Sequence, residues 1–569
     1  MFTSLPTNAF DFMDWPWSRI EPYYLDLVRR PLKQGNVSNW LEDWSRLGEL
    51  LYETYQRLWL ATSIDTQDEL ARKRFTLFLD EVYLLAQSAD QKLKEKLLAS
   101  GLEPDGFEIP LRNMRAEAKI YRETNLPLLA QEMKLNTEYD LITSLQSFLL
   151  DGKEYTLEQL RSLYRDPDRQ QRQRAWELAS ERQMADREAI NDLWTRLMEV
   201  RGQIAANAGL SDFRAYRWLK LLRFDYTPKD CKRFHQAIQA AAVPAAHRLY
   251  ERRRRKLGLE TLRPWDLNVD PDGLPPLRPF ENPSELEEEV AAVFNRLDPD
   301  LGAYFEIMRQ EGLLDLENRK GKSPSGFCTD FPVIRRPFIL MNAVGIHEDV
   351  QTLLHESGHA FHVFESAHLP YLQQLQVGME FGEVASTAME LLGQPYLSIE
   401  RGGFYSPSEL ARAQIEFLES TICFWPYMAV VDAFQHWVYE NHQAASNPAN
   451  CDAAWEDLWD RYMVGVDWTG FEEEKITGWQ RKPHIHQDPF YYIEYGLAQL
   501  GALQVWRNAL KDQASAVVSY RKALSLGGTV PIPKLYATAG IKFAFDENTL
   551  QEAIDLAESM IEELESNDA

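Results

Sequence analysis

Apolar and polar positions follow a helical period along most of this chain. Between about residue 40 and residue 200, apolar side chains recur every three or four positions, as in the segment "WLEDWSRLGELLYETYQRLWLA". Strand-like alternation is scarce in this region. The pattern predicts a succession of α-helices, one of which is expected to begin beside Asp166 and Pro167 and to continue towards Gly209.

Convincing strand signals occur in one segment, "SGFCTDFPVIRRPFILMNAVG" at 325–345. Upstream of it, residues 264–283 include six prolines and are expected to form an extended loop, because proline at this density excludes both helix and central strand. Beyond residue 346 the pattern is again helical. The sequence therefore predicts a mainly α fold with a small β-sheet.

Charge narrows the classes of function. The chain of 569 residues carries 61 Lys and Arg against 87 Asp and Glu, which gives a net charge of −26. This charge repels nucleic acids and anionic membrane surfaces, so neither is an expected partner. The runs "ERRRRK" (251–256) and "ELEEEV" (285–290) are expected to be solvated helix faces.

Three further features bear on where the protein works. Residues 1–20 lack the basic start and apolar stretch of a signal peptide, so we expect the cytoplasm. The most apolar run, "TICFWPYMAVV" at 421–431, is shorter than the roughly 20 residues that span a bilayer and predicts a buried helix. The cysteines are far apart and form no CxxC pair, and we expect reduced, buried thiols at Cys231, Cys328, Cys423 and Cys451.

The segment "HESGH" at 355–359 carries the chemistry of a metal site. On an α-helix, His355 and His359 lie on one face, where both imidazoles can reach one zinc ion. Glu356 would lie beside the metal, as suits a general base for zinc-activated water. The alternative is a pair of helix-surface histidines near unrelated acids.

A catalytic zinc held by two histidines needs a third protein ligand. The metzincin spacing fails, because Glu365 stands where a third histidine would be. His362 is about 10.5 Å of helical rise from His355, too far to share one ion, so we expect it to support a ligand or to pack.

A carboxylate from the segment "GMEFGEVASTAMELLGQ" (378–394) is the remaining option. Glu383 and Glu390 are seven residues apart and share a helix face, so one can bind the metal while the other supports a ligand. Glu380 is expected to be a surface carboxylate.

A late segment, "PHIHQDPFYYIEYG" (483–496), is rich in histidine and tyrosine. Attack on an amide creates an oxyanion, and a neutral Tyr O–H or His N–H aimed at it can contribute about 3 to 4 kcal/mol. The alternative is that these aromatic side chains belong to the core.

These motifs resemble the zinc oligopeptidases related to thimet oligopeptidase, and most closely the oligoendopeptidase F branch. The resemblance spans about residues 200–545, with a further likeness in "YRDPDRQQRQRAWE", whereas residues 1–150 share only a general helical character. The segments that carry it are "SGFC", "RPFILMNAVG", "TLLHESGHAFH", "FGEVASTAMELL", "PHIHQDPFYYIEYGLAQLGALQVW" and "LGGTVPIPKLYATAGI".

The resemblance implies roles for individual residues. One zinc per chain would be held by His355, His359 and Glu383, with Glu356 as the base and Glu390 and His362 supporting the ligands. His484 and Tyr495 would contact the substrate and stabilise the oxyanion, although Tyr491 or Tyr492 could take the place of Tyr495. Further substrate-binding residues would be Tyr491, Tyr492, His486, Asn342 and Gly345.

The fold implied by the resemblance is a gluzincin-like, mostly helical ellipsoid with a deep channel and a small sheet beside the HExxH helix. In that sheet, "RPFILMNAVG" would provide an edge for an extended peptide. We expect an N-terminal helical region over 1–195 and a catalytic domain over 196–569.

The function that follows is that of a cytoplasmic zinc endopeptidase, which cuts internal bonds of short unfolded oligopeptides. A related channelled enzyme could instead release dipeptides or single residues from a C-terminus, and would need a cationic group for the substrate carboxylate. A peptide-binding module without catalysis is a third possibility, disfavoured because a binder has no need of Glu356.

Overall fold

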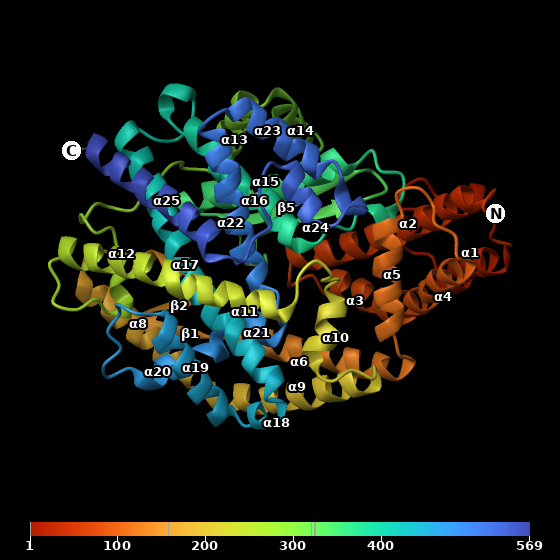
Figure 1. Ribbon diagram of the computed structural model, residues 1–569, viewed down its shortest axis with the longest axis horizontal. Helices are drawn as coiled ribbons and strands as arrows, with labels where there is room; N and C mark the ends of the chain where they lie inside the picture. Colours follow the sequence, from red (N-terminus) through yellow and green to blue (C-terminus); the bar gives the residue numbers. More distant parts are fainter. Residues whose placement is uncertain (1, 157–158, 320, 324–325, 569) are drawn as a thin grey trace. The chain divides into compact units, whose positions relative to one another are not determined.

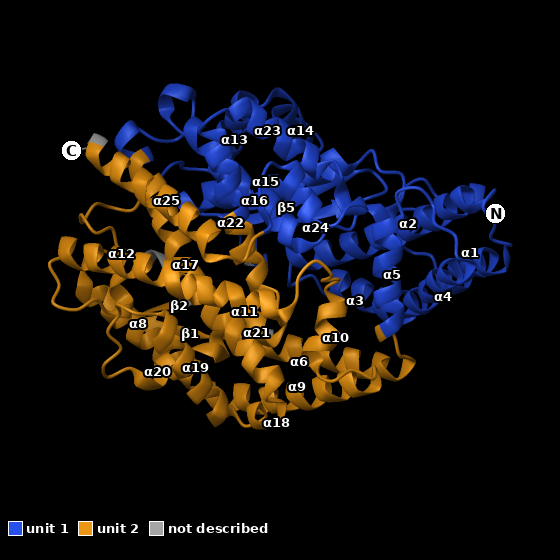
Figure 2. Cartoon of the chain, viewed as in Figure 1, with its two compact units in different colours: residues 1–119, 278–410, 501–543 blue, residues 120–277, 411–500, 544–569 orange. Residues whose placement is uncertain are grey.

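The computed structural model describes residues 2–568 apart from 157–158, 320 and 324–325, so Ser325 of the predicted strand segment lies outside the described residues. The chain forms two compact units, and each combines three separate segments (Figure 2). Unit 1 comprises residues 1–119, 278–410 and 501–543; unit 2 comprises 120–277, 411–500 and 544–569. This division differs from the one predicted at residue 195, because helices distant in sequence pack into the same core.

The first segment of unit 1 is a group of helices around an aromatic core. Trp40 and Trp44 are almost fully buried there, with ring centroids 5.1 Å apart. Asp68 caps the N-terminus of the helix that begins at Glu69, because its carboxylate accepts hydrogen bonds from the N–H groups of Leu70 and Ala71. The helices are α1 (Trp17–Arg29), α2 (Val37–Ile64), α3 (Glu69–Phe78), α4 (Leu84–Ser100) and α5 (Glu108–Ile120) (Figure 1).

The remainder of unit 1 places two helices against a small sheet. Strands β3 (Leu314–Glu317), β5 (Arg336–Ala343) and β4 (Phe327–Phe331) lie in that order, with β5 parallel to β3 and antiparallel to β4. Helix α15 (His347–Ser366) packs on β4, β5 and α16 (Met379–Gly393). The other helices are α13 (Pro283–Leu297), α14 (Pro299–Gln310), α23 (Gln513–Leu524) and α24 (Ile532–Thr538).

The small sheet corrects one expectation. Strand β5 contains most of "RPFILMNAVG", and it is the central strand, paired on one side through Leu314 with Ile339 and on the other through Cys328 with the same residue. Both sides of the β5 backbone are therefore already paired, and β5 cannot add a peptide strand as predicted. Strand β4, in contrast, lies at an edge of the sheet. The cause is the pairing of β3, a strand whose signal at 314–317 the hydrophobic pattern did not reveal.

Unit 2 is built mainly from helices. Its most apolar predicted run, 421–431, lies within α17 (Pro407–Glu440) and is largely buried, as predicted. The other elements are α6 (Leu126–Ser144), β1 (Ser147–Leu150), β2 (Lys153–Thr156), α7 (Leu160–Leu163), α8 (Arg169–Met184), α9 (Arg187–Asn207), α10 (Phe213–Lys220), α11 (Pro228–Ala237), α12 (Val243–Lys256), α18 (His442–Ala445), α19 (Pro448–Tyr462), α20 (Glu472–Ile476), α21 (Pro483–His486), α22 (Tyr492–Ala509, ending in unit 1) and α25 (Glu547–Asp568).

Two local predictions for unit 2 are wrong. The first is the succession of helices without strands over 40–200, because strands β1 and β2 form an antiparallel hairpin there. Its turn, Asp151-Gly152, has positive φ at both residues, and an Asp-Gly pair is a known signal for such a turn. The long helix expected to run to Gly209 is two helices. It breaks at Ala185 and Asp186, where the Asp186 carboxylate accepts from a distant side chain, that of Gln146.

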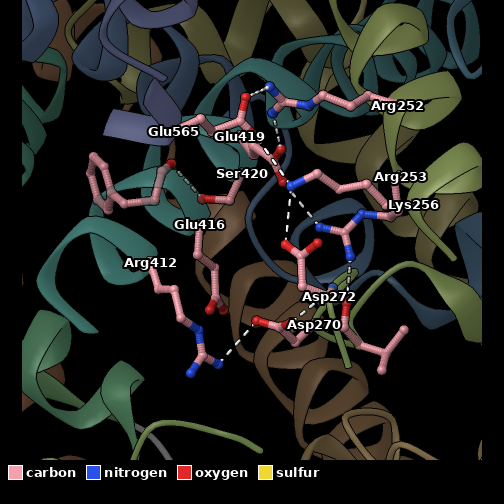
Figure 3. A network of polar contacts seen from close by, with 12 residues as sticks. Arg252, Arg253, Lys256, Asp270, Asp272, Arg412, Glu416, Glu419, Ser420 and Glu565 are labelled. Carbon is pink, nitrogen blue, oxygen red and sulfur yellow. Dashed lines mark hydrogen bonds and ion pairs between the residues drawn. The ribbon is translucent and has the colours of Figure 1, made fainter. Parts of the chain in front are cut away.

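The basic run at 251–256 is paired rather than freely solvated (Figure 3). Arg252 and Arg253 both donate to Glu419 of α17, and Lys256 donates to Asp272 at 3.0 Å. The expected solvated helix face is therefore wrong for these side chains, because distant acids reach them. The proline-rich segment behaves as predicted: a short 3₁₀ turn at Pro264–Asp266 precedes a loop that ends at α13.

The cysteines are all unpaired; Cys231 and Cys451 are buried, whereas Cys328 and Cys423 are partly exposed, contrary to the expectation of burial. Within the described residues, none of the helices is both long and apolar enough for a membrane span. The predicted mainly α fold with a small sheet beside the HExxH helix is confirmed.

Candidate active site

Helix α15 carries the HESGH segment and is well defined at its start. The Asp349 carboxylate accepts hydrogen bonds from the N–H groups of Val344 and Ile346 at 2.7 and 3.0 Å, which satisfies backbone donors where the helix begins. Farther along, Leu353, Leu354 and Phe361 are fully buried. The helix is thus held at its N-terminus and along its apolar face, and a ligand helix needs such rigidity.

Gly358, the fourth residue of HESGH, permits the close approach of α16. A Cβ atom at this position would lie 2.4 Å from the carbonyl oxygen of Ala385 and 2.6 Å from Cα of Ser386. Both are backbone atoms of α16, so no side-chain rotation could make room. The absence of a side chain therefore brings α16, and Glu383 with it, against the two histidines. Motif spacing alone gave no indication of this role.

Three potential metal ligands converge between α15 and α16. Oε2 of Glu383 lies 3.5 Å from Nε2 of His355 and 3.8 Å from Nε2 of His359. Two ligand atoms that bind one tetrahedral zinc at about 2.0–2.1 Å are themselves about 3.4 Å apart. The observed spacing therefore fits a zinc ion bound by two imidazoles and one carboxylate.

Glu390 lies on the far side of His355 from Glu383. Its Oε1 is 2.7 Å from Nδ1 of His355, so Nδ1 carries a proton, and Nε2, which faces Glu383, is the nitrogen left to bind a metal. Ser386 Oγ donates to the Glu383 carboxylate at 3.2 Å and to the Glu383 carbonyl at 3.0 Å. Each of the two acids thus contacts a different side of the site, although both lie on one helix face.

Burial works against the negative charge at this site. It raises the pKa of Glu390, against the opposing hydrogen bond with His355, and it raises the pKa of Glu356, against the charges of His359 and His355. Burial lowers the pKa of His355, but contacts with Glu383 and Glu390 prevail and leave it well above its ordinary value. Three carboxylates thus compete for few positive charges, a setting that a divalent cation would stabilise.

Glu356 is buried, with 7% of its surface exposed, and none of the close ligand contacts involves its carboxylate. After burial, the charge of Glu356 is the largest influence that raises the pKa of Cys328 on β4. Glu356 therefore lies near the edge strand of the sheet. A carboxylate placed there is available to exchange protons with a group bound beside the metal ligands.

Other predicted residues of unit 1 have different surroundings. Glu380 is buried with 3% exposed, which contradicts its expected surface position. His362 packs edge-on against Phe381, and burial lowers its pKa to about 4, which favours the packing alternative. Asn342 donates to the carbonyl of Ser323 at 2.7 Å. Gly345 has φ of 84° and lies against the backbone of Phe280.

The late histidine and tyrosines form one cluster within unit 2. His484 on α21 and Tyr492 and Tyr495 on α22 have ring centroids 5.1 to 5.7 Å apart, and Tyr491 lies 5.3 Å from Tyr495. The hydroxyl of Tyr495 is 3.4 Å from Nε2 of His484. Phe490, whose φ is 69°, makes the sharp turn that precedes Tyr491. We call these four residues, His484, Tyr491, Tyr492 and Tyr495, the tyrosine cluster.

His486 does not belong to this cluster. It is fully buried, stacks on Tyr139 at 4.4 Å and on Trp479 at 5.8 Å, and burial lowers its pKa to about 3. In this structure the His486 ring has no exposed surface with which to contact a substrate, so the geometry does not favour the predicted role. Helix α21 is a single turn, and its packing directs His484 and His486 into different surroundings.

A second group of potential metal ligands, Cys231, Asp432 and His436, lies in unit 2. Oδ2 of Asp432 already hydrogen-bonds with Nε2 of His235 at 2.7 Å and lies 3.4 Å from Nε2 of His436. Arg214 donates to Nδ1 of His436 at 3.2 Å, so in the neutral ring Nε2 carries the proton and offers no lone pair to a metal. The guanidinium would also repel a dication. We interpret this group as a buried polar network of the fold.

An HExxH helix that packs on a small sheet and meets a carboxylate from the following helix is the arrangement of a metallopeptidase. The model of Peptidase family M3 matches residues 162–554. The chain belongs to this family.

Curated relatives and solved structures agree with this assignment. The chain is 25% identical over 339 residues to "Oligoendopeptidase F homolog" of Lactococcus lactis subsp. lactis, covering 57% of this chain and 52% of the relative. It is 24% identical over 330 residues to "Oligopeptidase PepF" of Bacillus subtilis, covering 57% and 47%. The matched part thus spans about half the length of these relatives.

The similarity of fold extends over almost the whole chain. A structure titled "PZ PEPTIDASE A with inhibitor 2" superposes with a TM-score of 0.89 and 28% identity, covering 99% of each chain. A putative oligoendopeptidase F gives a TM-score of 0.89 and 27% identity, covering 99% of this chain and 98% of the other.

Proposed function

We propose that this protein is a zinc-dependent endopeptidase that hydrolyses internal peptide bonds of short, unfolded oligopeptides. The observation that carries the proposal is the convergence of His355, His359 and Glu383, with Glu356 beside them. A peptide-binding module has no use for a buried carboxylate at that position. Membership of Peptidase family M3 and the names of the relatives support the same reaction.

His355, His359 and Glu383 would hold a single zinc, and the spacing of their ligand atoms is suitable for it. Zinc bound there would act as a Lewis acid, which polarises the peptide carbonyl and makes a water molecule acidic. Glu390 holds the proton on Nδ1 of His355 and so keeps Nε2 available as a ligand. Ser386 restrains the carboxylate of Glu383.

Glu356 is the general base in this proposal. Its carboxylate accepts a proton from the attacking water and delivers it to the nitrogen of the leaving amine, so the residue returns to its initial state within one turnover. The raised pKa of the buried Glu356 suits a group that must both accept and release a proton. Strand β4, near Glu356, is an edge strand of the sheet and would be the strand to pair with an extended peptide.

Tyr495 and His484 are proposed to donate hydrogen bonds to the oxyanion, on the strength of their match to the family motif. Their proximity within the tyrosine cluster is compatible with a shared role, since the Tyr495 hydroxyl and the His484 ring lie within 3.4 Å. Such donors act when charge develops on the carbonyl oxygen and so lower the barrier without tightening substrate binding. We also propose a cytoplasmic location, which the four unpaired cysteines support.

A mass-spectrometric digest of a mixed peptide library, with and without a chelator, tests the proposal. Peptides of about 5 to 20 residues should be cut internally, and the chelator should abolish cleavage. A native disulfide-linked protein should survive, because a narrow substrate channel, as the resemblance implies, admits only unfolded chain. Sequential loss of residues from C-termini, or cleavage of the folded protein, would contradict the proposal.

A further inference from the structure

Lys482 lies directly before α21, is partly exposed, and differs from the buried Lys322 in how its charge is compensated. Buried Lys322 donates to the Asp315 carboxylate at 2.8 Å and to the carbonyls of Asp315, Glu317 and Met341. All the donor capacity of that ammonium group is used. Lys322 is thus a structural lysine that joins the ends of β3 and β5.

Lys482, in contrast, uses one donor. Its Nζ donates to the hydroxyl of Tyr492 at 2.9 Å, and across the described residues no carboxylate lies within ion-pair distance of it. Its other close neighbours are aromatic faces: Nζ is 4.1 Å from the ring centre of Tyr492 and 5.4 Å from that of Tyr427. An ammonium group has three N–H donors, so two remain available.

The residue before Lys482, Arg481, is also a cation, and its contacts differ from those of Lys482. Arg481 donates to Oγ1 of Thr477 at 3.2 Å and to the main-chain carbonyl of Glu474, and the charge of the Glu474 carboxylate also acts on its guanidinium. Of these two neighbouring cations, Lys482 is therefore the one whose close contacts are a hydroxyl and aromatic rings, in a chain whose net charge is −26. With acids in such excess, a charge left without one is a feature that folding alone does not require.

Burial lowers the pKa of Lys482 to about 8. The facing hydroxyls stay neutral through this range, because burial raises the pKa of Tyr427 to about 12 and that of Tyr492 well above its ordinary value. The ammonium is thus charged at neutral pH but poorly stabilised. An anion brought to it would recover the electrostatic energy that burial has cost.

Lys482 also lies close to the residues proposed to act on the substrate. The tyrosine that it contacts, Tyr492, has its ring 5.1 Å from that of His484 and 5.6 Å from that of Tyr495. One aromatic side chain thus separates the ammonium from the proposed oxyanion donors. A peptide held by those donors would present its neighbouring residues to Lys482.

We propose that Lys482 is a specificity-determining residue whose ammonium binds a carboxylate of the peptide substrate, either an acidic side chain near the cleaved bond or the C-terminal carboxylate. The inference rests on the proposed peptidase function. It assigns to this enzyme a preference for peptides that carry a carboxylate within reach of Lys482, which the net charge of the chain would otherwise disfavour.

Matched peptides separate the two sources of the carboxylate. One series places Glu or Gln at each position on either side of a fixed cleavage site, and a second series ends in a free carboxylate or an amide. For the wild-type enzyme, we expect kcat/KM to favour the charged member of one pair by about tenfold to hundredfold, the size of one charge-assisted hydrogen bond. The series in which the ratio appears identifies the source.

Substitutions of Lys482 then test whether this residue causes the preference for the charged peptide. Lys482→Met and Lys482→Gln should bring the ratio close to one, whereas Lys482→Arg should preserve it. Lys475→Met is the matched control, because Lys475 is already paired with Asp460 at 2.9 Å, and its ratio should equal that of the wild type. A wild-type ratio near one in every pair, or a ratio that persists in both neutral variants, would overturn the inference.

Equilibrium binding of the same peptide pairs to Glu356→Gln measures the preference without turnover. If the wild type cleaves no peptide and yet the preference in binding depends on Lys482, the proposed function fails and the carboxylate site stands. If cleavage is observed without any charge preference, the function stands and the carboxylate site fails.

Discussion

Replacement of Gly358 by alanine tests whether the close packing of α15 on α16 positions the metal ligands. The added Cβ would lie 2.4 Å from the carbonyl oxygen of Ala385 and 2.6 Å from Cα of Ser386. Non-bonded heavy atoms prefer a separation of about 3.5 Å, so one helix must move by about 1 Å. Because Glu383 lies on the displaced helix, its carboxylate moves relative to His355 and His359.

The expected effect on folding is smaller than the effect on metal binding. Overpacking costs about 1–3 kcal/mol, and alanine recovers about 1 kcal/mol of helix propensity, so the free energy of unfolding should fall by about 0–2 kcal/mol. Zinc affinity should fall by about 10-fold to 100-fold, the loss that follows when a ligand is no longer held in position.

Chelator competition measures the zinc Kd, and thermal unfolding of the metal-free protein measures stability. Gly382→Ala is the matched control on α16, because a Cβ there meets nothing closer than a Met379 side-chain atom at 3.5 Å. Its zinc affinity should remain that of the wild type. An unchanged affinity in Gly358→Ala, or an equal loss in both variants, would refute the packing argument.

Four further predictions follow from the site. Glu383→Ala should lose zinc almost entirely, whereas Glu390→Ala should retain it with about 10-fold to 100-fold weaker affinity; metal analysis that gave the reverse order would exchange the two roles. Glu356→Gln should keep zinc and bind peptide but lose nearly all turnover, so a variant with substantial kcat would exclude it as the base. Tyr495→Phe should lower kcat by about 10² to 10³ with little change in KM, and an unchanged kcat would return the role to another member of the tyrosine cluster. The preference for the peptide that carries the carboxylate should be present below pH 8 and disappear above it, because Lys482, whose pKa is lowered to about 8, loses its charge as the pH rises; a preference constant from pH 7 to pH 9.5 would contradict this.

The ligand helix was predictable because its signals are local. The four-residue spacing of His355 and His359 places both on one face of any α-helix, whatever surrounds it. The apolar positions before and after them indicate which face is buried, and α15 indeed spans His347–Ser366 with Leu353 and Leu354 fully buried. Periodicity and motif thus gave the fold class and the pair of histidines without reference to distant residues.

Side-chain surroundings depended on long-range packing. Glu383 and Glu390 share a helix face and were equivalent as candidates from spacing alone, but the crossing of α15 and α16 at Gly358 places one near both Nε2 atoms and the other at Nδ1 of His355. Likewise, His484 and His486 are two residues apart, yet only His484 joins the tyrosine cluster.

By itself, the sequence determined the helical character of this protein, the small sheet before the HESGH segment and the residues able to bind a metal. The tertiary structure decided which strand is central, which acid faces which imidazole nitrogen, and which groups surround the Lys482 ammonium. The physical reason is one of range. Helical periodicity arises from contacts three or four residues apart, whereas strand order, ligand geometry and the compensation of the Lys482 charge depend on segments that are distant in sequence and meet only when the cores form.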